Sequence, residues 1–282
     1  MAKTVAYGLK RALVYGLVAA FVFFSASPFV WMVITTFKQD RDLYRPTNNP
    51  FIFNDPPTLD NLRLLFLNTN FTVFLRISIL IGIAVVIITL LVSVPAAYSL
   101  ARLTGKWGER AGIGIFLIYL VPPTLLFIPL FRIVVWLGLN DSLWSMIVVY
   151  PTISIPFCTW LLMGFFKSIP IDLEEAAMVD GYSHLMSFVK VVMPLSVSGI
   201  VAVIVFTFTL TLHDFIYALT FVSASKYRTI SVGVPTELVR GDVFYWQSLM
   251  AASVIVALPI GFVYNIFLDR LVAGFTMGAV KG

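Results

Sequence analysis

One polar segment, between two strongly apolar stretches, carries residue types whose spacing suggests a specific contact. Residues 174–194 read EEAAMVDGYSHLMSFVKVVMP. Asp172 and Glu175 have the three-residue spacing of a capping box at the start of a helix. Gly181 suits the left-handed residue that follows a helix, and Ser183 can cap the next one. The pattern predicts a short helix, a glycine turn and a second short helix that a proline ends.

Docking against another protein is the role that this pair of helices favours. Two isolated short helices are marginal in water, so their apolar faces need a surface to cover them. The adjacent residues Ala176 and Ala177 permit a close approach of the backbone to a groove in a partner. Resting on the membrane surface is the alternative. Anionic lipid would repel the segment, which carries four acids: Asp172, Glu174, Glu175 and Asp180.

A second group with chemical potential lies in the apolar stretch TFTLTLHDFIYALTF, which contains His213 and Asp214. These residues lie roughly 14 residues into a predicted membrane span, or about 21 Å at 1.5 Å per residue. Ionisable groups at such a depth must face protein or water. Two interpretations remain open: Asp214 binds a solute that crosses the membrane, or it forms a buried structural pair with a neighbouring helix.

The composition shows which solvent surrounds these residues. The chain has 282 residues, of which 60% are hydrophobic and 12% are charged. Soluble domains carry about 25% charged residues, so the composition indicates a lipid environment. The net charge of +5 fits cytoplasmic loops of a membrane protein rather than a nucleic-acid partner. Cys158 is the single cysteine, so no internal disulfide forms, and no Cys/His cluster indicates a metal site.

The helices that must position these groups are membrane spans, since a span needs about 20 mostly apolar residues. The first apolar stretch is too long for a cleaved signal peptide and is predicted to be retained. The sequence therefore predicts an all-α integral membrane protein with six transmembrane helices. Six stretches qualify, at residues 13–37, 77–100, 111–131, 143–166, 199–222 and 249–271.

Lysine and arginine predict the orientation of these spans. Three positive residues precede the first span, and the short loop after the second holds Arg102, Lys106 and Arg110. Both segments are expected in the cytoplasm. Both termini and residues 174–194 then lie there too, while the loops near 38–76, 132–142 and 223–248 face outward. The third span contains VPPTLLFIP, which predicts either a kinked helix or a broken wall beside a path.

No residues in the chain suggest catalysis. A phosphate-binding loop needs G-x-x-x-x-G-K-[ST], but the only Gly-Lys pair, Gly105-Lys106, is followed by Trp107. His184 and His213 are the only histidines, and neither belongs to a recognisable nucleophile, base and acid set. We therefore predict a protein with no catalytic residues, no metal site and no bound cofactor.

The polar segment resembles the EAA loop of permease subunits in binding-protein-dependent ABC importers. That pattern is Glu-Ala-Ala, three residues, Gly, nine residues, Ile, any residue, Leu-Pro. It is matched by Glu175-Ala176-Ala177, Gly181, Val191, Met193 and Pro194. The C-terminal sequence LVAGFTMGAVKG is similar to the tail of the inner permease of maltose/trehalose-type sugar importers. With the six-span layout, the resemblance covers essentially the whole chain.

The resemblance implies a type I ABC importer permease, a single transmembrane domain over residues 1–282 with a cytoplasmic EAA coupling loop at 168–194. We call residues 168–194 the hairpin segment. In the family this loop sits in a cleft of an ATPase subunit, and Glu175 would pair with a basic group there. The implied ATPase-coupling residues are Glu174, Glu175, Ala176, Ala177, Asp180 and Gly181.

The resemblance also implies partners and a location. These are a second permease subunit in a heterodimer, two ATPase subunits that use ATP and Mg, an extracytoplasmic solute-binding protein and the lipid bilayer. Nucleic acid is not expected. The location is the cytoplasmic (inner) membrane of a bacterium or archaeon, and the solute is a sugar. Candidate residues of the substrate pathway are His213, Asp214, Tyr119, Tyr150 and Trp160. For the three aromatic residues, packing or anchoring at the membrane interface is the alternative.

Other functions are compatible with parts of the pattern. An ion-coupled secondary carrier often shows internal repeats and buried ionisable sites, but no convincing repeat is present here. An ABC importer permease for a non-sugar solute would carry the same coupling loop. A membrane enzyme is disfavoured because no nucleophile or metal set is visible.

Overall fold

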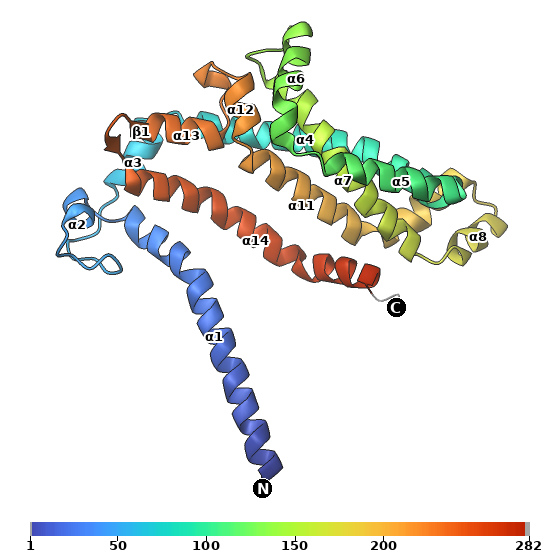
Figure 1. Cartoon of the computed structure of the whole chain (residues 1–282), viewed down its shortest axis with the longest axis horizontal. Helices are drawn as coiled ribbons and strands as arrows, with labels where there is room; N and C mark the ends of the chain where they lie inside the picture. Colours follow the sequence, from blue (N-terminus) through green and yellow to red (C-terminus); the bar gives the residue numbers. More distant parts are fainter. Residues whose placement is uncertain (1, 280–282) are drawn as a thin grey trace. The chain divides into compact units, whose positions relative to one another are not determined.

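A computed structural model describes residues 2–279, whose regular elements are helices apart from one short pair of strands (Figure 1). The predicted all-α class is confirmed. By internal contacts the chain falls into two units, each of which is described by itself. Unit 1 comprises residues 1–71 and 234–260, and unit 2 comprises residues 72–233 and 261–282.

Four described helices are long and apolar enough to cross a membrane. Two further spans result if each of two bent helix pairs counts as one span. The described residues therefore contain four to six candidate spans, whereas the sequence predicted six continuous helices. The bent pairs are Gly105–Tyr119 with Pro123–Trp136 and His184–Leu195 with Val197–His213. The four long spans are Lys10–Thr36, Phe71–Leu103, Leu143–Ser168 and Trp246–Leu268.

The third predicted span is a broken helix. α5 (Gly105–Tyr119) and α6 (Pro123–Trp136) meet at 89°. Pro122 precedes Pro123, and a residue before proline is disfavoured in the helical region, so it adopts ψ 124. Pro123 then fits the first turn of α6, where its missing N–H costs nothing. The stretch is therefore a broken helix rather than a continuous kinked one, and its place beside a path stays a prediction.

Unit 2 is arranged around α7 (Leu143–Ser168), which contacts α5, α6, α11 (Val197–His213) and α12 (Ile216–Phe221). Figure 1 shows α6 and α12 near one end of α7 and α8 (Asp172–Val179) near the other. One buried apolar cluster lies at the end of α7 near α8, and a second lies at the end near α6 and α12. The short elements are η1 (Ser99–Leu103), α9 (His184–Ser187), η2 (Phe188–Val192), α10 (Met193–Leu195) and η3 (Ser225–Tyr227).

Small and hydroxyl-bearing residues hold these helices together, as is usual where lipid removes the hydrophobic drive between helices. Thr89 of α4 (Phe71–Tyr98) and Ser154 of α7 share a buried hydrogen bond of 2.7 Å. Gly199 of α11 lies against Phe165 of α7, where a Cβ would meet the ring at 2.6 Å. The close approach of α11 to α7 therefore requires glycine at this position.

Unit 1 contains α1 (Ala2–Thr36), α2 (Asp40–Tyr44) and α3 (Asp60–Leu67). It also contains parts of two helices that cross the boundary, α13 (Ile230–Leu238) and α14 (Trp246–Ala279). Between them, β1 (Val239–Arg240) pairs antiparallel with β2 (Val243–Phe244).

A buried carboxylate organises the first predicted outer loop. Asp42 accepts hydrogen bonds from Lys38 Nζ at 3.2 Å, Asn54 Nδ2 at 2.8 Å and Asn54 N at 3.1 Å. Lys38 and Asp42 are both buried. Burial alone would raise the pKa of Asp42, but the bonds from Asn54 and Lys38 outweigh it and lower that pKa below its ordinary value. The loop is therefore folded around an ionised group.

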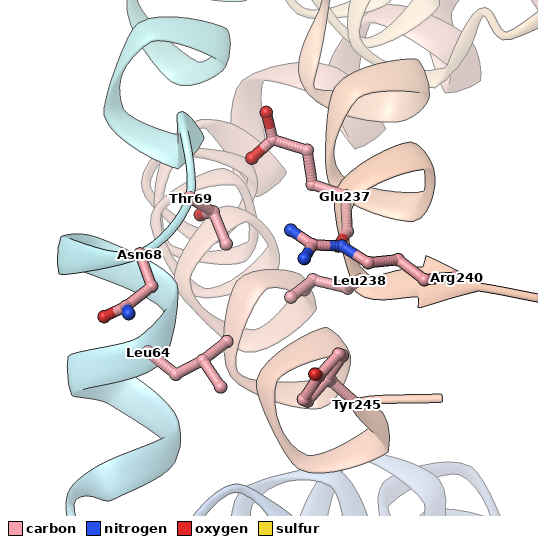
Figure 2. A pocket seen from close by; sticks show the side chains of 7 residues that line it. All are labelled: Leu64, Asn68, Thr69, Glu237, Leu238, Arg240 and Tyr245. Atoms are coloured by element: carbon pink, nitrogen blue, oxygen red, sulfur yellow. The ribbon is translucent and has the colours of Figure 1, made fainter. Parts of the chain in front are cut away.

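A pocket of about 170 Å³ lies between α3 and the segment that joins α13 to α14. Figure 2 shows the Arg240 side chain extending from this segment toward α3. Glu237 accepts hydrogen bonds from Asn70 N and Asn70 Nδ2, both at 2.7 Å. The pocket is lined by Leu64, Asn68, Thr69, Glu237, Leu238, Arg240 and Tyr245.

Candidate functional site

The hairpin segment forms the predicted pair of helices joined by a glycine turn. α8 ends at Val179, and Gly181 follows with φ +94. The N–H of Gly181 donates to Met178 O and that of Tyr182 to Ala177 O, both at 3.0 Å. These two bonds form a Schellman motif, which satisfies the last carbonyls of α8. The prediction of a left-handed glycine is confirmed.

The second helix begins as predicted and ends later than predicted. Ser183 Oγ accepts from Met186 N at 3.3 Å, so the predicted cap is present. Pro194 was expected to end this helix, but the chain continues through the π-helix η2 and α10 to Ser196. A proline ring clashes with the carbonyl four residues before it. That residue, Lys190, lies in η2, where the wider turn gives the ring room.

The capping box predicted for Asp172 and Glu175 is wrong. α8 is preceded by Ile171, which is already helical (φ −65, ψ −29), and no side chain caps the helix. The N–H groups of Glu174 and Glu175 donate to Ile171 O at 2.9 and 3.1 Å. Because the backbone supplies these acceptors, the helix start needs no carboxylate, and the Glu175 side chain is left exposed.

Glu174 and Glu175, which the sequence groups together, face different surroundings. Glu174 is 5% exposed. Tyr98 donates from its hydroxyl to Glu174 Oε2 at 2.8 Å, and Arg102 Nε lies 2.7 Å from Glu174 Oε1. The Nε and Oε1 atoms make no aligned hydrogen bond, so this contact is an ion pair. Arg102 Nη2 also donates to Ile169 O at 2.5 Å.

Aromatic rings surround this ion pair. The ring of Tyr98 lies 4.3 Å from that of Phe188 and 6.0 Å from that of Phe166, measured between centroids. Phe166 and Phe188 are 6.1 Å apart. We call Tyr98, Arg102, Phe166, Glu174 and Phe188 the junction. It joins the end of α4, the π-helix η1, the end of α7 and both arms of the hairpin segment.

Sequence reasoning missed Tyr98 and Arg102. Arg102 entered only as a loop charge that set orientation, although the structure leaves its side chain 10% exposed. A usable signal was present: the two residues are four apart at the end of an apolar helix, so both can reach one acceptor. The identity of that acceptor depends on tertiary packing.

The remaining predicted coupling residues are mostly accessible. Glu175, Ala176, Asp180 and Gly181 are exposed, and Ala177 is 8% exposed. Large apolar side chains on the same segment also lie open. The most exposed are Val179 at 88% and Leu185 at 71%, followed by Val189, Ile171, Met186 and Leu173. The hairpin segment thus presents an apolar surface with acidic residues beside it.

The predicted pathway residues fall into separate groups. Asp214 Oδ2 accepts from Tyr150 Oη at 2.8 Å and from Ala218 N at 3.1 Å. The second bond lies at the start of α12, so Asp214 ends α11 and helps to begin the next helix. The predicted fifth span is therefore not continuous to residue 222. Tyr150 is fully buried and packs edge-on against Tyr217, whereas His213 is exposed.

Tyr119 and Trp160 belong to an aromatic cluster instead. Trp160 stacks on Phe116 at 4.4 Å between centroids, and Tyr119 lies 5.0 Å from Phe157. Phe157 also contacts Trp160 and Phe206. Trp160 is 36% exposed, so part of its ring is available to another molecule.

Comparison with known families gives a match over residues 93–276, to the model described as "Binding-protein-dependent transport system inner membrane component". This range is more than half of the chain, and it contains the junction and the hairpin segment.

Three curated relatives illustrate the similarity at the level of whole chains. The sulfoquinovosyl glycerol transport system permease protein SmoH of Agrobacterium fabrum is 35% identical, over 90% of this chain and 88% of its own. The trehalose/maltose transport system permease protein MalG of Thermococcus litoralis is 30% identical, over 97% and 98%. The trehalose transport system permease protein SugB of Mycobacterium tuberculosis is 34% identical, over 80% and 82%.

A solved structure shares the fold. It is a chain from a bacterial ABC transporter involved in the import of the acidic polysaccharide alginate. The TM-score is 0.78 at 17% sequence identity, and the match covers 95% of this chain and 98% of that one.

Proposed function

The chain belongs to the family of binding-protein-dependent transport system inner membrane components, and on that premise we propose that it forms half of the translocation pathway of an ATP-driven sugar importer. Within this family it is a non-catalytic, multi-pass permease subunit of the inner membrane. Its hairpin segment couples the pathway to a separate ATPase. ATP and Mg are used by that partner.

The exposed apolar side chains of the hairpin segment carry the coupling proposal. Val179 and Leu185 flank the glycine turn and are 88% and 71% exposed. Leaving such side chains in water is unfavourable, and burying each one fully gains about 1.5–3 kcal/mol. A short amphipathic helix entering a groove of a partner supplies that burial. Glu175 and Asp180 are exposed on the same segment and supply acidic groups for basic residues of the ATPase.

The chemistry of the relatives supports a sugar as the solute. Their names specify sulfoquinovosyl glycerol, trehalose and maltose. We assign Trp160 and Tyr119 to the pathway, since a sugar-binding surface combines a flat aromatic ring with a few polar groups. His213 is exposed, and we assign it to the pathway as a hydrogen-bonding group apart from this aromatic cluster. Asp214 and Tyr150 bond to each other, so they act by positioning the break between α11 and α12.

The proposed assembly contains this chain, a second permease subunit, two ATPase subunits and an extracytoplasmic solute-binding protein. The hairpin segment and both termini lie in the cytoplasm. The ends of the chain, residue 1 and residues 280–282, fall outside the described residues, as does the last part of the C-terminal sequence LVAGFTMGAVKG.

Site-directed cross-linking tests this proposal. Cys158 is the only cysteine of this chain and is 0% exposed, so an introduced cysteine is the only accessible thiol on this chain. In the assembled transporter, Val179→Cys should cross-link to the ATPase subunit. Phe51→Cys is the control, because Phe51 is 61% exposed in a loop assigned to the outer side. It should react with an impermeant thiol reagent added outside and give no ATPase adduct.

Three results would each contradict part of the proposal. Labelling of Val179→Cys from outside would reverse the assigned orientation. Solute uptake by this chain alone, driven by an ion gradient in liposomes, would favour a secondary carrier. If the solute-binding protein carries a solute that is not a sugar, the sugar assignment is wrong and the coupling assignment remains.

A further inference from the structure

Glu174 and Glu175 are adjacent in α8, yet one is 5% exposed and the other is open to solvent. We propose that Tyr98 and Arg102 are positioning residues that fasten Glu174, and with it the hairpin segment, to the inner end of the 71–103 span. When the hairpin segment moves, its motion is then transmitted to that span through the Glu174–Arg102 contact. This inference rests on the proposed function, in which the hairpin segment engages an ATPase.

The buried ion pair makes the attachment hard to open. A carboxylate and a guanidinium that are 6% and 10% exposed at their side chains have lost most of their hydration. Separating them there would leave two uncompensated charges, which is far more costly than separating an exposed pair. Movement of α8 therefore carries Arg102 along instead of breaking the contact.

Further hydrogen bonds fix the loop that leads into the hairpin. Arg102 Nη2 donates to Ile169 O, three residues before α8 begins. Tyr98 donates to the second oxygen of Glu174. One arginine thus holds both the entry to α8 and a side chain in its first turn, so α8 cannot pivot freely about residues 169–171.

The second arm of the hairpin segment is attached at the same place. The ring of Phe188 lies 4.3 Å from that of Tyr98. Ser187 Oγ donates to Glu174 O at 3.5 Å, which links the two arms directly. The exposed turn at Gly181 lies between these two attached arms.

Unusual helix geometry marks both sides of the junction. Arg102 lies in the π-helix η1, and Phe188 is the first residue of the π-helix η2. Single π-turns are rare and are frequently found at functional sites. Their presence where α4 and the second arm meet α8 sets this contact apart from ordinary helix packing.

The proposal predicts a loss of coupling, which a purely structural role does not produce. The test uses the complete transporter in liposomes, with binding protein and solute, and measures solute uptake and ATP hydrolysis in the same vesicles. Glu174→Gln should lower the solute imported per ATP by at least about fivefold, the low end of usual coupling between sites. ATP hydrolysis takes place in the partner and should persist. Lys167→Gln is the control, because the Lys167–Glu109 pair at the same end of α7 is exposed.

A second variant keeps the test decisive if the Glu174→Gln complex does not assemble. Tyr98→Phe keeps the ring packed on Phe188 and removes only the bond to Glu174, and it should lower the same ratio by a smaller factor. An unchanged ratio in an assembled Glu174→Gln complex, or in Tyr98→Phe if Glu174→Gln does not assemble, overturns the positioning role alone. Absence of ATP-driven uptake by the native complex overturns the proposed function itself, so the two failures are distinguishable.

Discussion

Arg102 Nε lies 2.7 Å from Glu174 Oε1, although one residue ends a membrane span and the other begins a surface helix. The pair is buried together with Tyr98, and aromatic rings close it off from solvent. The acidic residue beside it, Glu175, remains free to meet a partner. In the proposed function, these neighbouring glutamates divide two tasks: Glu174 holds the hairpin segment in the permease, and Glu175 contacts the ATPase.

Charge reversal at Glu175 should uncouple transport. Glu175→Lys replaces the acid proposed to contact the ATPase, so uptake per ATP should fall. Asp172→Lys is the matched control, since it is an exposed acid in the same first turn and loses the same helix-dipole interaction, about 0.3–1 kcal/mol. Uptake and ATP hydrolysis in liposomes measure the difference. Equal effects of the two substitutions would remove the assigned contact at Glu175.

Gly181→Ala should strain the turn between the two arms. Gly181 has φ +94, and no atom lies within 4 Å of the Cβ position, so the cost comes from the backbone alone. A left-handed residue with a side chain costs about 1–2 kcal/mol. We expect lower uptake with unchanged membrane insertion. Gly164→Ala, also with open space but in an ordinary helix, should leave uptake unaltered.

Gly199→Ala should loosen the packing of α11 on α7. The new methyl would lie 2.6 Å from the Phe165 ring, so the ring or the helix must shift. Overpacking of this kind costs about 1–3 kcal/mol. Thermal unfolding in detergent should show a lower Tm. The control is Gly261→Ala, where nothing lies within 4 Å; a similar Tm loss there would contradict the assigned close approach.

The loop around Asp42 should lose order in acid. The folded-state pKa of Asp42 lies below its ordinary value of 3.8, so its stabilising effect is complete above that value. It is lost as the pH falls through the lower, folded-state pKa. Hydrogen exchange at the Asn54 amide, which donates to Asp42, should accelerate there. Asp42→Asn should abolish this acid step and Asp60→Asn, at an exposed site, should retain it.

Trp160 and Tyr150 should differ in what they affect. Trp160→Ala removes an accessible ring and should raise the solute concentration needed for half-maximal uptake, whereas Trp160→Phe should restore most of the function. Tyr150→Phe removes a bond to Asp214 and should lower stability by about 1 kcal/mol without changing that concentration. A shift in the half-saturating concentration for Tyr150→Phe would return Asp214 to the solute path.

Local patterns were read correctly from the sequence. Gly181 and Ser183 do what their types predict, because turn and cap geometry depends on a few adjacent residues. The apolar stretches also locate the long helices. The capping-box prediction was wrong because Ile171 is already helical. Its backbone carbonyl, and not a side chain, accepts hydrogen bonds from the first N–H groups of α8.

Contacts between segments that are distant in the chain could not be predicted from the sequence. The ion pair of Arg102 with Glu174 depends on how the ends of α4 and α7 meet, and no periodicity specifies that. The break at Asp214 was also missed, since an aspartate in an apolar run predicts a buried partner but not a carboxylate that bonds to a backbone N–H four residues later.

The π-helices beside the junction have a consequence for chain length. A π-turn holds one residue more than an α-turn. Deleting a single residue from Ser99–Leu103 would leave an ordinary α-turn there and change the directions in which the side chains of that turn point. Arg102 would no longer point to its acceptor, even though every side chain of the contact survived. Insertions and deletions in this segment are therefore expected to be selected against more strongly than most of its substitutions.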